Sequence, residues 1–329
     1  MGQKKVTFFF ESYDHEKFLE NVISLVQSQK YDVDFIVLTD KNKFANKYSK
    51  IKIRQTKNIF LNSLILQNIN SEFLITTTPS FGSRELPMSK NIKYIYYFHS
   101  LVSSINIYPN NSFVNFDYIS YPNKIIFKEL LQQGVEKQKL FDGGYPFLIN
   151  KNLNKKKGIL IAPTWGPASL LEQKTILEKF IKVNSDNFDI YFKFHPMESN
   201  ENIQFVNKIS KKYANIHLLD SLVNEFDYLI TDWSGIAIEY FYLTKGKILF
   251  VDTEQKHRND SLRLDKTSIE NKMRNVLGES VTLKFFANIN LLDYKFLNYD
   301  SQIATSFINS LIPANNAELL DNILNILND

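Results

Sequence analysis

The segment 228–240 combines the residue types of a phosphate-binding turn. An apolar strand pattern ends at residue 231, small polar residues follow, and a helical pattern begins near residue 234. The backbone N–H groups in the first turn of a helix have no partner within the helix, so they can bind an anion. Gly235 leaves space for a phosphate and Glu239 can reach ribose hydroxyls, although simple helix capping by Asp232 and Ser234 is the alternative. The residues of this segment expected to hold the pyrophosphate and nucleotide are Thr231, Asp232, Ser234, Gly235 and Glu239.

Two further segments of the same half end predicted strands. In residues 192–196, the alternation of side chains along a strand places Lys193 and His195 on one side. A cation and an imidazole there can neutralise charge on a leaving phosphate. Thr164 follows another strand, within 162–166, and its hydroxyl and the loop amides are expected to hold phosphate or base. A histidine at a strand end is often structural, and the segment 162–166 alone is only a turn. Together with 228–240, however, the two segments predict a donor site.

The first half offers candidates for a general base. His99 follows the apolar run 94–98, and a neutral imidazole at a strand end can accept a proton from an attacking hydroxyl. A histidine flanked by aromatic residues is about as often part of the core. Glu11, Asp14 and His15, which come directly after the first predicted strand, are therefore kept as alternative bases.

Strand and helix patterns alternate through both halves, which predicts parallel sheets covered by helices. A polar and basic stretch, 150–157, separates the halves. We therefore expect two Rossmann-like domains, 1–150 and 151–329, facing a central cleft, with the C-terminal helices packing back on the first. The predicted strands are 6–10, 33–38, 51–53, 73–76, 92–98, 158–161, 188–193, 216–218, 228–230 and 248–251. The predicted helices include 58–66, 122–133, 169–183, 200–210, 235–242, 301–311 and 317–327.

Composition narrows the classes of function. The 329 residues include no cysteine, which excludes disulfides, thiolate metal sites and a cysteine nucleophile. Glu11 ends the first apolar run too early for a signal peptide, and no run of 18 apolar residues follows, so a cytoplasmic chain is expected. The acidic pair 32–34 opens a strand and is interpreted as a solvated turn, not a metal site. The basic stretch 41–57 is either a solvated face or a surface for anionic lipid on the inner face of the membrane; no motif accompanies it that would indicate nucleic acid.

Residues 162–165, 195–196 and 231–239 resemble the CDP-glycerol glycerophosphotransferases, a GT-B-fold family that builds teichoic-acid and capsule polymers. The resemblance implies a CDP-activated donor in the second domain and a glycan or lipid-linked acceptor. It gives His99 and His195 acid–base and phosphate-stabilising roles, with no metal and no cofactor besides the donor. The sequence departs from the family pattern at 99–103 and at Gly166, where family members carry H-G-T-P-x-K and an arginine. A nucleotide-sugar glycosyltransferase and a non-catalytic nucleotide-sugar or glycan-binding partner are the alternative functions.

Overall fold

The computed structural model describes residues 4–39, 41–55, 59–79, 81–151, 153–219, 224–255, 268–296 and 300–328. The chain divides into two units. Unit 1 comprises Met1–Ile149 and Asn309–Asp329, and unit 2 comprises Asn150–Ile308. The sequence placed the boundary at residue 150; the structure places it between Ile149 and Asn150 and assigns residues 309–329 to unit 1.

Unit 1 contains a seven-stranded sheet in the order β3-β2-β1-β4-β5-β6-β7, and every pair of neighbouring strands is parallel. Parallel neighbours require crossover connections, and in the described residues a helix lies between all successive strands of this sheet except β4 and β5. The carboxyl ends of β1, β4 and β5 therefore lie side by side at one edge of the sheet. The strands are β1 (Lys5–Phe10), β2 (Asp32–Val37), β3 (Lys52–Gln55), β4 (Phe73–Thr76), β5 (Lys93–Tyr96), β6 (Tyr118–Tyr121) and β7 (Leu140–Asp142).

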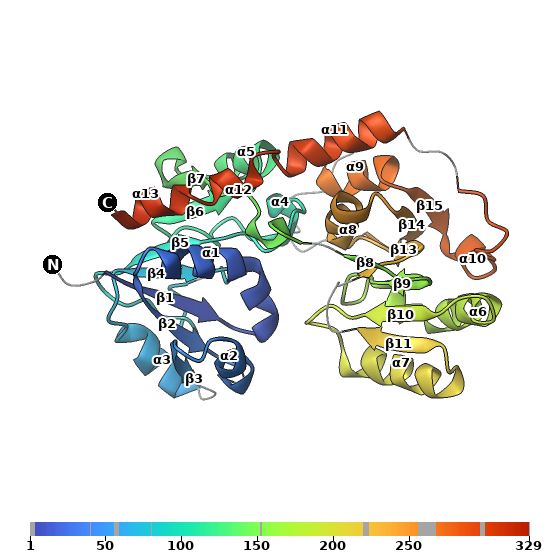
Figure 1. Ribbon diagram of the computed structural model, residues 1–329, viewed down its shortest axis with the longest axis horizontal. Helices are drawn as coiled ribbons and strands as arrows, with labels where there is room; N and C mark the ends of the chain where they lie inside the picture. Colours follow the sequence, from blue (N-terminus) through green and yellow to red (C-terminus); the bar gives the residue numbers. More distant parts are fainter. Residues whose placement is uncertain are drawn as a thin grey trace. The chain divides into compact units, whose positions relative to one another are not determined.

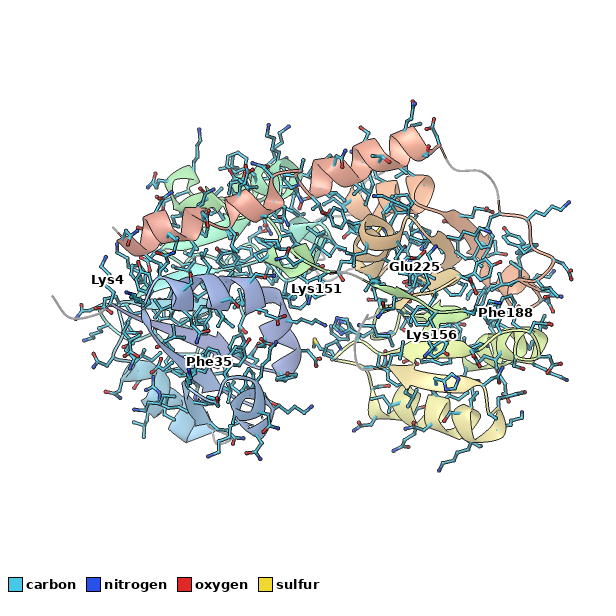
Figure 2. All side chains as sticks on the ribbon, in the orientation of Figure 1. Lys4, Phe35, Lys151, Lys156, Phe188 and Glu225 are labelled. Carbon is cyan, nitrogen blue, oxygen red and sulfur yellow. The ribbon has the colours of Figure 1, made fainter. Side chains whose placement is uncertain are left out.

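Helices from both ends of the chain cover one face of this sheet (Figure 1). In α1 (Glu16–Ser28) the buried positions recur every three or four residues, which turns one stripe of the helix toward the strands. Side chains of α13 (Asn322–Asn328) enter the same core, and Lys4 Nζ donates to the carbonyl of Leu327 at 2.9 Å. Figure 2 labels Lys4 and the core residue Phe35 of β2. The other helices of this unit are α2 (Lys41–Lys47), α3 (Ile59–Gln67), α4 (Ser104–Ile107), α5 (Lys124–Gln132) and α12 (Asn316–Leu319).

Unit 2 contains a six-stranded parallel sheet in the order β11-β10-β9-β13-β14-β15. A second, two-stranded sheet pairs β8 (Asn154–Lys155) with β12 (Asn224–Glu225), close to the labelled residues Lys156 and Glu225 in Figure 2. In the larger sheet β9 lies between β10 and β13, so the loops after these three strands are neighbours. The strands are β9 (Ile159–Ile161), β10 (Ile190–Lys193), β11 (Ile216–Leu219), β13 (Tyr228–Thr231), β14 (Lys247–Asp252) and β15 (Glu279–Thr282).

The core of unit 2 lies between one face of this sheet and three of its helices, which contribute Leu177, Val206 and Phe286 among other buried side chains. Another helix, α8, packs against β13 and β14. The helices are α6 (Lys174–Asn184), α7 (Asn200–Lys212), α8 (Ile236–Thr244), α9 (Ile269–Val276) and α10 (Leu283–Phe286). The division of the chain after Ile308 falls within α11 (Ser301–Leu311).

The predicted fold class of two parallel α/β sheets is confirmed. One interpretation is wrong: the acidic pair 32–34 is not a solvated turn but lies within β2. Asp34 is only 1% exposed, and its carboxylate pairs with Lys5 Nζ at 3.2 Å and Arg54 Nη2 at 2.9 Å. Thr7 also donates to it. A buried carboxylate needs such partners, and they come from neighbouring strands that a local sequence pattern does not reveal.

Candidate functional site

Unit 2 brings its three predicted segments together at the carboxyl ends of adjacent strands. Thr164 follows β9, Lys193 ends β10 and Thr231 ends β13. In open α/β sheets the ligand sites lie at such ends. Because β9 is the central strand of the three, its loop can contact both neighbouring loops.

Asp232 joins the loop after β13 to the loop after β9. Its side chain is fully buried and accepts hydrogen bonds from the backbone N–H groups of Thr164 at 2.7 Å and Leu170 at 2.9 Å. Burial raises the pKa of this carboxyl to about 6, although these bonds, one from Trp233 N–H and the charge of Arg274 oppose the shift. Asp232 therefore fixes the positions of the two loops, because its carboxylate accepts from backbone amides in the loop after β9.

Thr231 also connects two loops of the protein through a hydrogen bond. It is fully buried, and its hydroxyl donates to the carbonyl of Ala162 in the neighbouring loop at 2.8 Å. We expected a pyrophosphate contact from both Thr231 and Asp232. That contact stays a prediction; the observed hydrogen bonds show that both side chains also hold the loops in position.

His195 has a defined tautomer. Its Nδ1 lies 3.1 Å from the backbone N–H of Met197, which can only donate, so Nδ1 accepts. The neutral ring must then carry its proton on Nε2 and offer an N–H donor there. The ring centroid lies 5.7 Å from that of Trp165 at an interplanar angle of 33°. Both His195 and Lys193 are half-buried at the end of β10, so each can meet an anionic ligand.

The helix after β13 begins slightly later than predicted. It is α8, starting at Ile236, with Gly235 in the N-cap position. Ser234 Oγ accepts a long hydrogen bond, 3.5 Å, from the N–H of Ile236, so a capping contact accompanies the predicted anion-binding role. Ser234, Gly235 and Glu239 are half-buried, and Glu239 lies in the first turn of the helix.

Arg274, from α9, was not predicted to belong to this site. Only 5% of it is exposed, and its Nη1 donates to the carbonyl of Asp232 at 2.8 Å. Its guanidinium lies 4.3 Å from the ring centroid of Trp233 and pairs with Asp252. Burial lowers the pKa of Arg274, although the two acidic partners oppose this. Helical spacing was the available signal: the buried positions of α9 are Ile269, Glu270, Met273 and Arg274.

Unit 1 collects all of its candidate bases at the edge formed by β1, β4 and β5. His99 Nδ1 lies 3.1 Å from the carbonyl oxygen of Thr77, which can only accept, so Nδ1 carries the proton. Nε2 of the neutral ring is then the proton acceptor. Glu11 accepts a hydrogen bond from the hydroxyl of Thr78 at 3.0 Å, and partial enclosure of its carboxylate raises its pKa.

His15 is in direct contact with His99. The ring centroids are 5.1 Å apart and the planes differ by 21°, which is a stacked arrangement. Burial lowers the pKa of His15 to about 4; the nearby Asp14 opposes this shift and Lys17 adds to it. His15 is therefore neutral at pH 7, and Asp14 is half-buried beside it in the same turn. The preferred base, His99, and the alternative bases Glu11, Asp14 and His15 therefore lie in one region of unit 1.

The basic stretch 41–57 is partly used inside unit 1. Lys47 Nζ lies 3.0 Å from Glu16 and 2.9 Å from Glu20, and Arg54 pairs with the buried Asp34. These two cations neutralise the protein's own carboxylates. Lys57 lies outside the described residues, and the cations left exposed are Lys41, Lys43, Lys50 and Lys52.

The described residues contain neither a cluster of metal-ligating side chains nor a helix that could span a membrane. Among them, no group of three or more His, Asp or Glu side chains is arranged to hold a metal ion. No helix in this part of the chain has the length and apolar character needed to cross a membrane.

Comparison with known proteins links unit 2 to a family. Residues 148–272 match the model of the CDP-glycerol:poly(glycerophosphate) glycerophosphotransferases, which confirms the resemblance predicted from the sequence for that segment. The matched segment contains every candidate site residue of unit 2 that the sequence predicted, and it ends just before Arg274. No curated protein sequence matches the chain.

Solved structures match the fold over nearly the whole chain. MnaA of S. aureus with UDP has a TM-score of 0.64 at 12% identity, covering 99% of this chain and 97% of its own. A putative UDP-N-acetylglucosamine 2-epimerase of Listeria monocytogenes has a TM-score of 0.59 at 12% identity, covering 98% and 95%. The wall teichoic acid polymerase TagF has a TM-score of 0.48 at 18% identity, covering 74% and 69%. At these identities the first two matches establish the fold, two parallel α/β domains of the GT-B kind.

Proposed function

We propose that the chain is a transferase that moves an alditol phosphate, most simply glycerol phosphate, from a CDP-activated donor to a hydroxyl of a glycan or lipid-linked acceptor. The observation that supports this best is the position of the family match. Residues 148–272 include the three loops at the ends of β9, β10 and β13, where the structure gathers the predicted donor residues. Family resemblance and site geometry thus point to the same part of unit 2.

The donor's phosphates would meet positively charged and N–H groups in unit 2. His195 offers an Nε2–H donor, because its Nδ1 is occupied by the amide of Met197. Lys193 supplies charge beside it at the end of β10. The amino end of α8, with Ser234 and Gly235, would add backbone N–H groups. Each of these groups favours negative charge, which builds up on the leaving phosphate during transfer.

The reaction would be a displacement at phosphorus. The acceptor oxygen forms a bond to the β-phosphorus, the bond from that phosphorus to the bridging oxygen breaks, and CMP leaves with the electron pair. His99 Nε2, the unprotonated nitrogen of its ring, would take the acceptor's proton. The imidazoles and Lys193 supply both the base and the countercharge, so we propose no metal ion or further cofactor in these roles.

A nucleotide-sugar glycosyltransferase is the second candidate, with attack at a sugar C1 in place of phosphorus. Two departures from the family pattern favour it: Ser100-Leu-Val-Ser follows His99, and Gly166 replaces an arginine. Both positions belong to segments that would meet the transferred group or its acceptor. The fold does not choose between the two reactions.

The experiment is a donor panel. The protein would be incubated with CDP-glycerol, CDP-ribitol, UDP-glucose or UDP-N-acetylglucosamine and a membrane extract as acceptor source, and released nucleotide would be separated by chromatography. We expect CMP release, reduced roughly 10²–10⁴-fold in His195→Ala. His217→Ala, which changes a partly exposed histidine on the edge strand β11, should retain it. UDP release alone would identify a glycosyltransferase, and no release from any donor would support a binding protein.

A further inference from the structure

The ring of His99 is held at one atom and across one face. Thr77 holds Nδ1 through the 3.1 Å contact to its carbonyl, and a single hydrogen bond does not by itself set the plane of a ring. His15 lies against the face, with 5.1 Å between centroids and 21° between planes. Together the two contacts define both the tautomer and the plane of His99. His15, Thr77 and His99 follow β1, β4 and β5 respectively, and the order of strands in the sheet brings these three segments together.

Two other aromatic rings also lie around the half-buried His99. Phe18 lies 5.7 Å away at 57° and Tyr108 lies 6.5 Å away at 87°, both measured to the centroid of His99. The hydroxyl of Tyr145 donates to the backbone carbonyl of His99 at 3.2 Å. Within this arrangement His15 makes the nearly parallel contact, so it is the residue that can set the plane.

The charge state of His15 suits such a role. Its Nδ1 is buried and, within the described part of the chain, has no hydrogen-bond partner. A pKa of about 4 keeps it neutral at pH 7, so it does not repel the positive charge that His99 gains when it takes a proton. An aromatic face beside a cation is instead attractive. The contact therefore uses the face of the His15 ring and not its Nδ1.

We propose that His15 is a positioning residue for His99: its ring, stacked on the imidazole that Thr77 anchors, holds Nε2 in the orientation from which it accepts the acceptor's proton. The catalytic part of this inference rests on the proposed function. The positioning part concerns the geometry of unit 1 alone. A misplaced catalytic group can cost about a hundredfold in rate, so a stacking contact can matter without touching substrate.

Two substitutions separate the ring from its nitrogens. His15→Phe keeps an aromatic face and should keep turnover of CDP-glycerol within about threefold of wild type. His15→Ala removes the face and should lower kcat by roughly 10–10² while leaving KM for CDP-glycerol nearly unchanged, since that donor is assigned to unit 2. Circular dichroism and thermal unfolding of both variants establish that they are folded. Equal loss in both variants, or full activity of His15→Ala, would overturn the proposal.

A spectroscopic measurement tests the positioning without any substrate. Long-range ¹H–¹⁵N correlation spectra of histidine-labelled protein distinguish the two neutral tautomers, and His99→Gln assigns the His99 signals. We expect the Nδ1–H tautomer for His99 in wild type and in His15→Phe. In His15→Ala the ring of His99 can turn out of line with the Thr77 carbonyl, which weakens the contact that sets the tautomer, so we expect some of the Nε2–H form beside the Nδ1–H form. If no donor supports turnover, the proposed function fails while this spectrum still decides the role of His15; unchanged His99 signals in His15→Ala would refute it.

Discussion

His99 and His195, the two histidines proposed to act in the transfer, have opposite tautomers. In each, the tautomer is set by a contact between Nδ1 and one backbone group. A carbonyl of Thr77 obliges His99 to keep its proton on Nδ1, whereas an amide of Met197 obliges His195 to keep it on Nε2. The remaining nitrogen is an acceptor in the first case and a donor in the second. The same side chain is thereby suited to a base in unit 1 and to phosphate binding in unit 2. The sequence predicted both residues, but the tautomers depend on loop carbonyls and amides that only the fold positions.

The raised pKa of Asp232 predicts how the stability of the fold depends on pH. Its pKa is raised from 3.8 in the unfolded chain to about 6, so the folded state binds more protons between these values. The free energy of unfolding should therefore fall as pH rises from 4 through 6, by up to about 3 kcal/mol from this group. Asp232→Asn should lack that decline. Urea unfolding followed by fluorescence would measure the free energy of unfolding of both proteins. Both tryptophans of the chain, Trp165 and Trp233, lie in the loops that Asp232 joins.

A matched control for Asp232 is available in the same unit. Asp227 accepts a hydrogen bond from the N–H of Gly158 at 2.8 Å but is exposed. Asp227→Asn should keep the pH profile of the wild type, because Asp232 is intact. If the pH profiles of wild type and Asp232→Asn are parallel, Asp232 does not titrate as we infer.

The elements of secondary structure were predictable where apolar periodicity is strong. The predicted strand 73–76 and helix 301–311 coincide with β4 and α11. The strand β15 was missed because it is a polar strand at the edge of the sheet, with one buried residue among its four. β7 has only three residues, none fully buried, so no alternation could indicate it. The predicted tail helix 317–327 is two helices, α12 and α13.

A substitution at Gly166 tests whether the loop after β9 positions the donor site. Its φ of +82° lies in the left-handed region, and a Cβ there would meet nothing within 4 Å. Gly166→Ala should therefore cost only the conformational term, about 1 kcal/mol in urea unfolding. Because this turn follows Trp165, whose ring lies beside His195, we also expect CDP-glycerol affinity to fall several-fold, measured by calorimetry.

The control for this loop comes from unit 1. Gly134 has the same φ of +82° and equally open surroundings. Gly134→Ala should carry a similar stability cost and leave donor affinity unchanged. Equal donor affinity in the two variants would mean that the turn at Gly166 does not position the donor site.

At the scale of the whole molecule, the sequence predicted two α/β units and most of the residues at their strand ends. It could not predict contacts between distant segments. Arg274 reaches Asp232 from a helix 42 positions later, and His15 meets His99 across three strands of one sheet. Nor could it foresee that Thr231 and Asp232 point into the protein. A strand-end motif identifies a loop as a candidate site, but burial decides which of its side chains face a ligand.

We propose that unit 2 holds a CDP-activated donor through His195 while His99 acts only on the acceptor. Isothermal titration of CDP-glycerol into wild type, His195→Ala and His99→Ala tests it most directly, alongside turnover of each. We predict binding by wild type, roughly tenfold or weaker affinity in His195→Ala, and unchanged affinity in His99→Ala despite a 10²–10⁴-fold loss of turnover. Loss of donor binding in a folded His99→Ala variant, with normal binding in His195→Ala, would rule out this assignment of donor binding to His195.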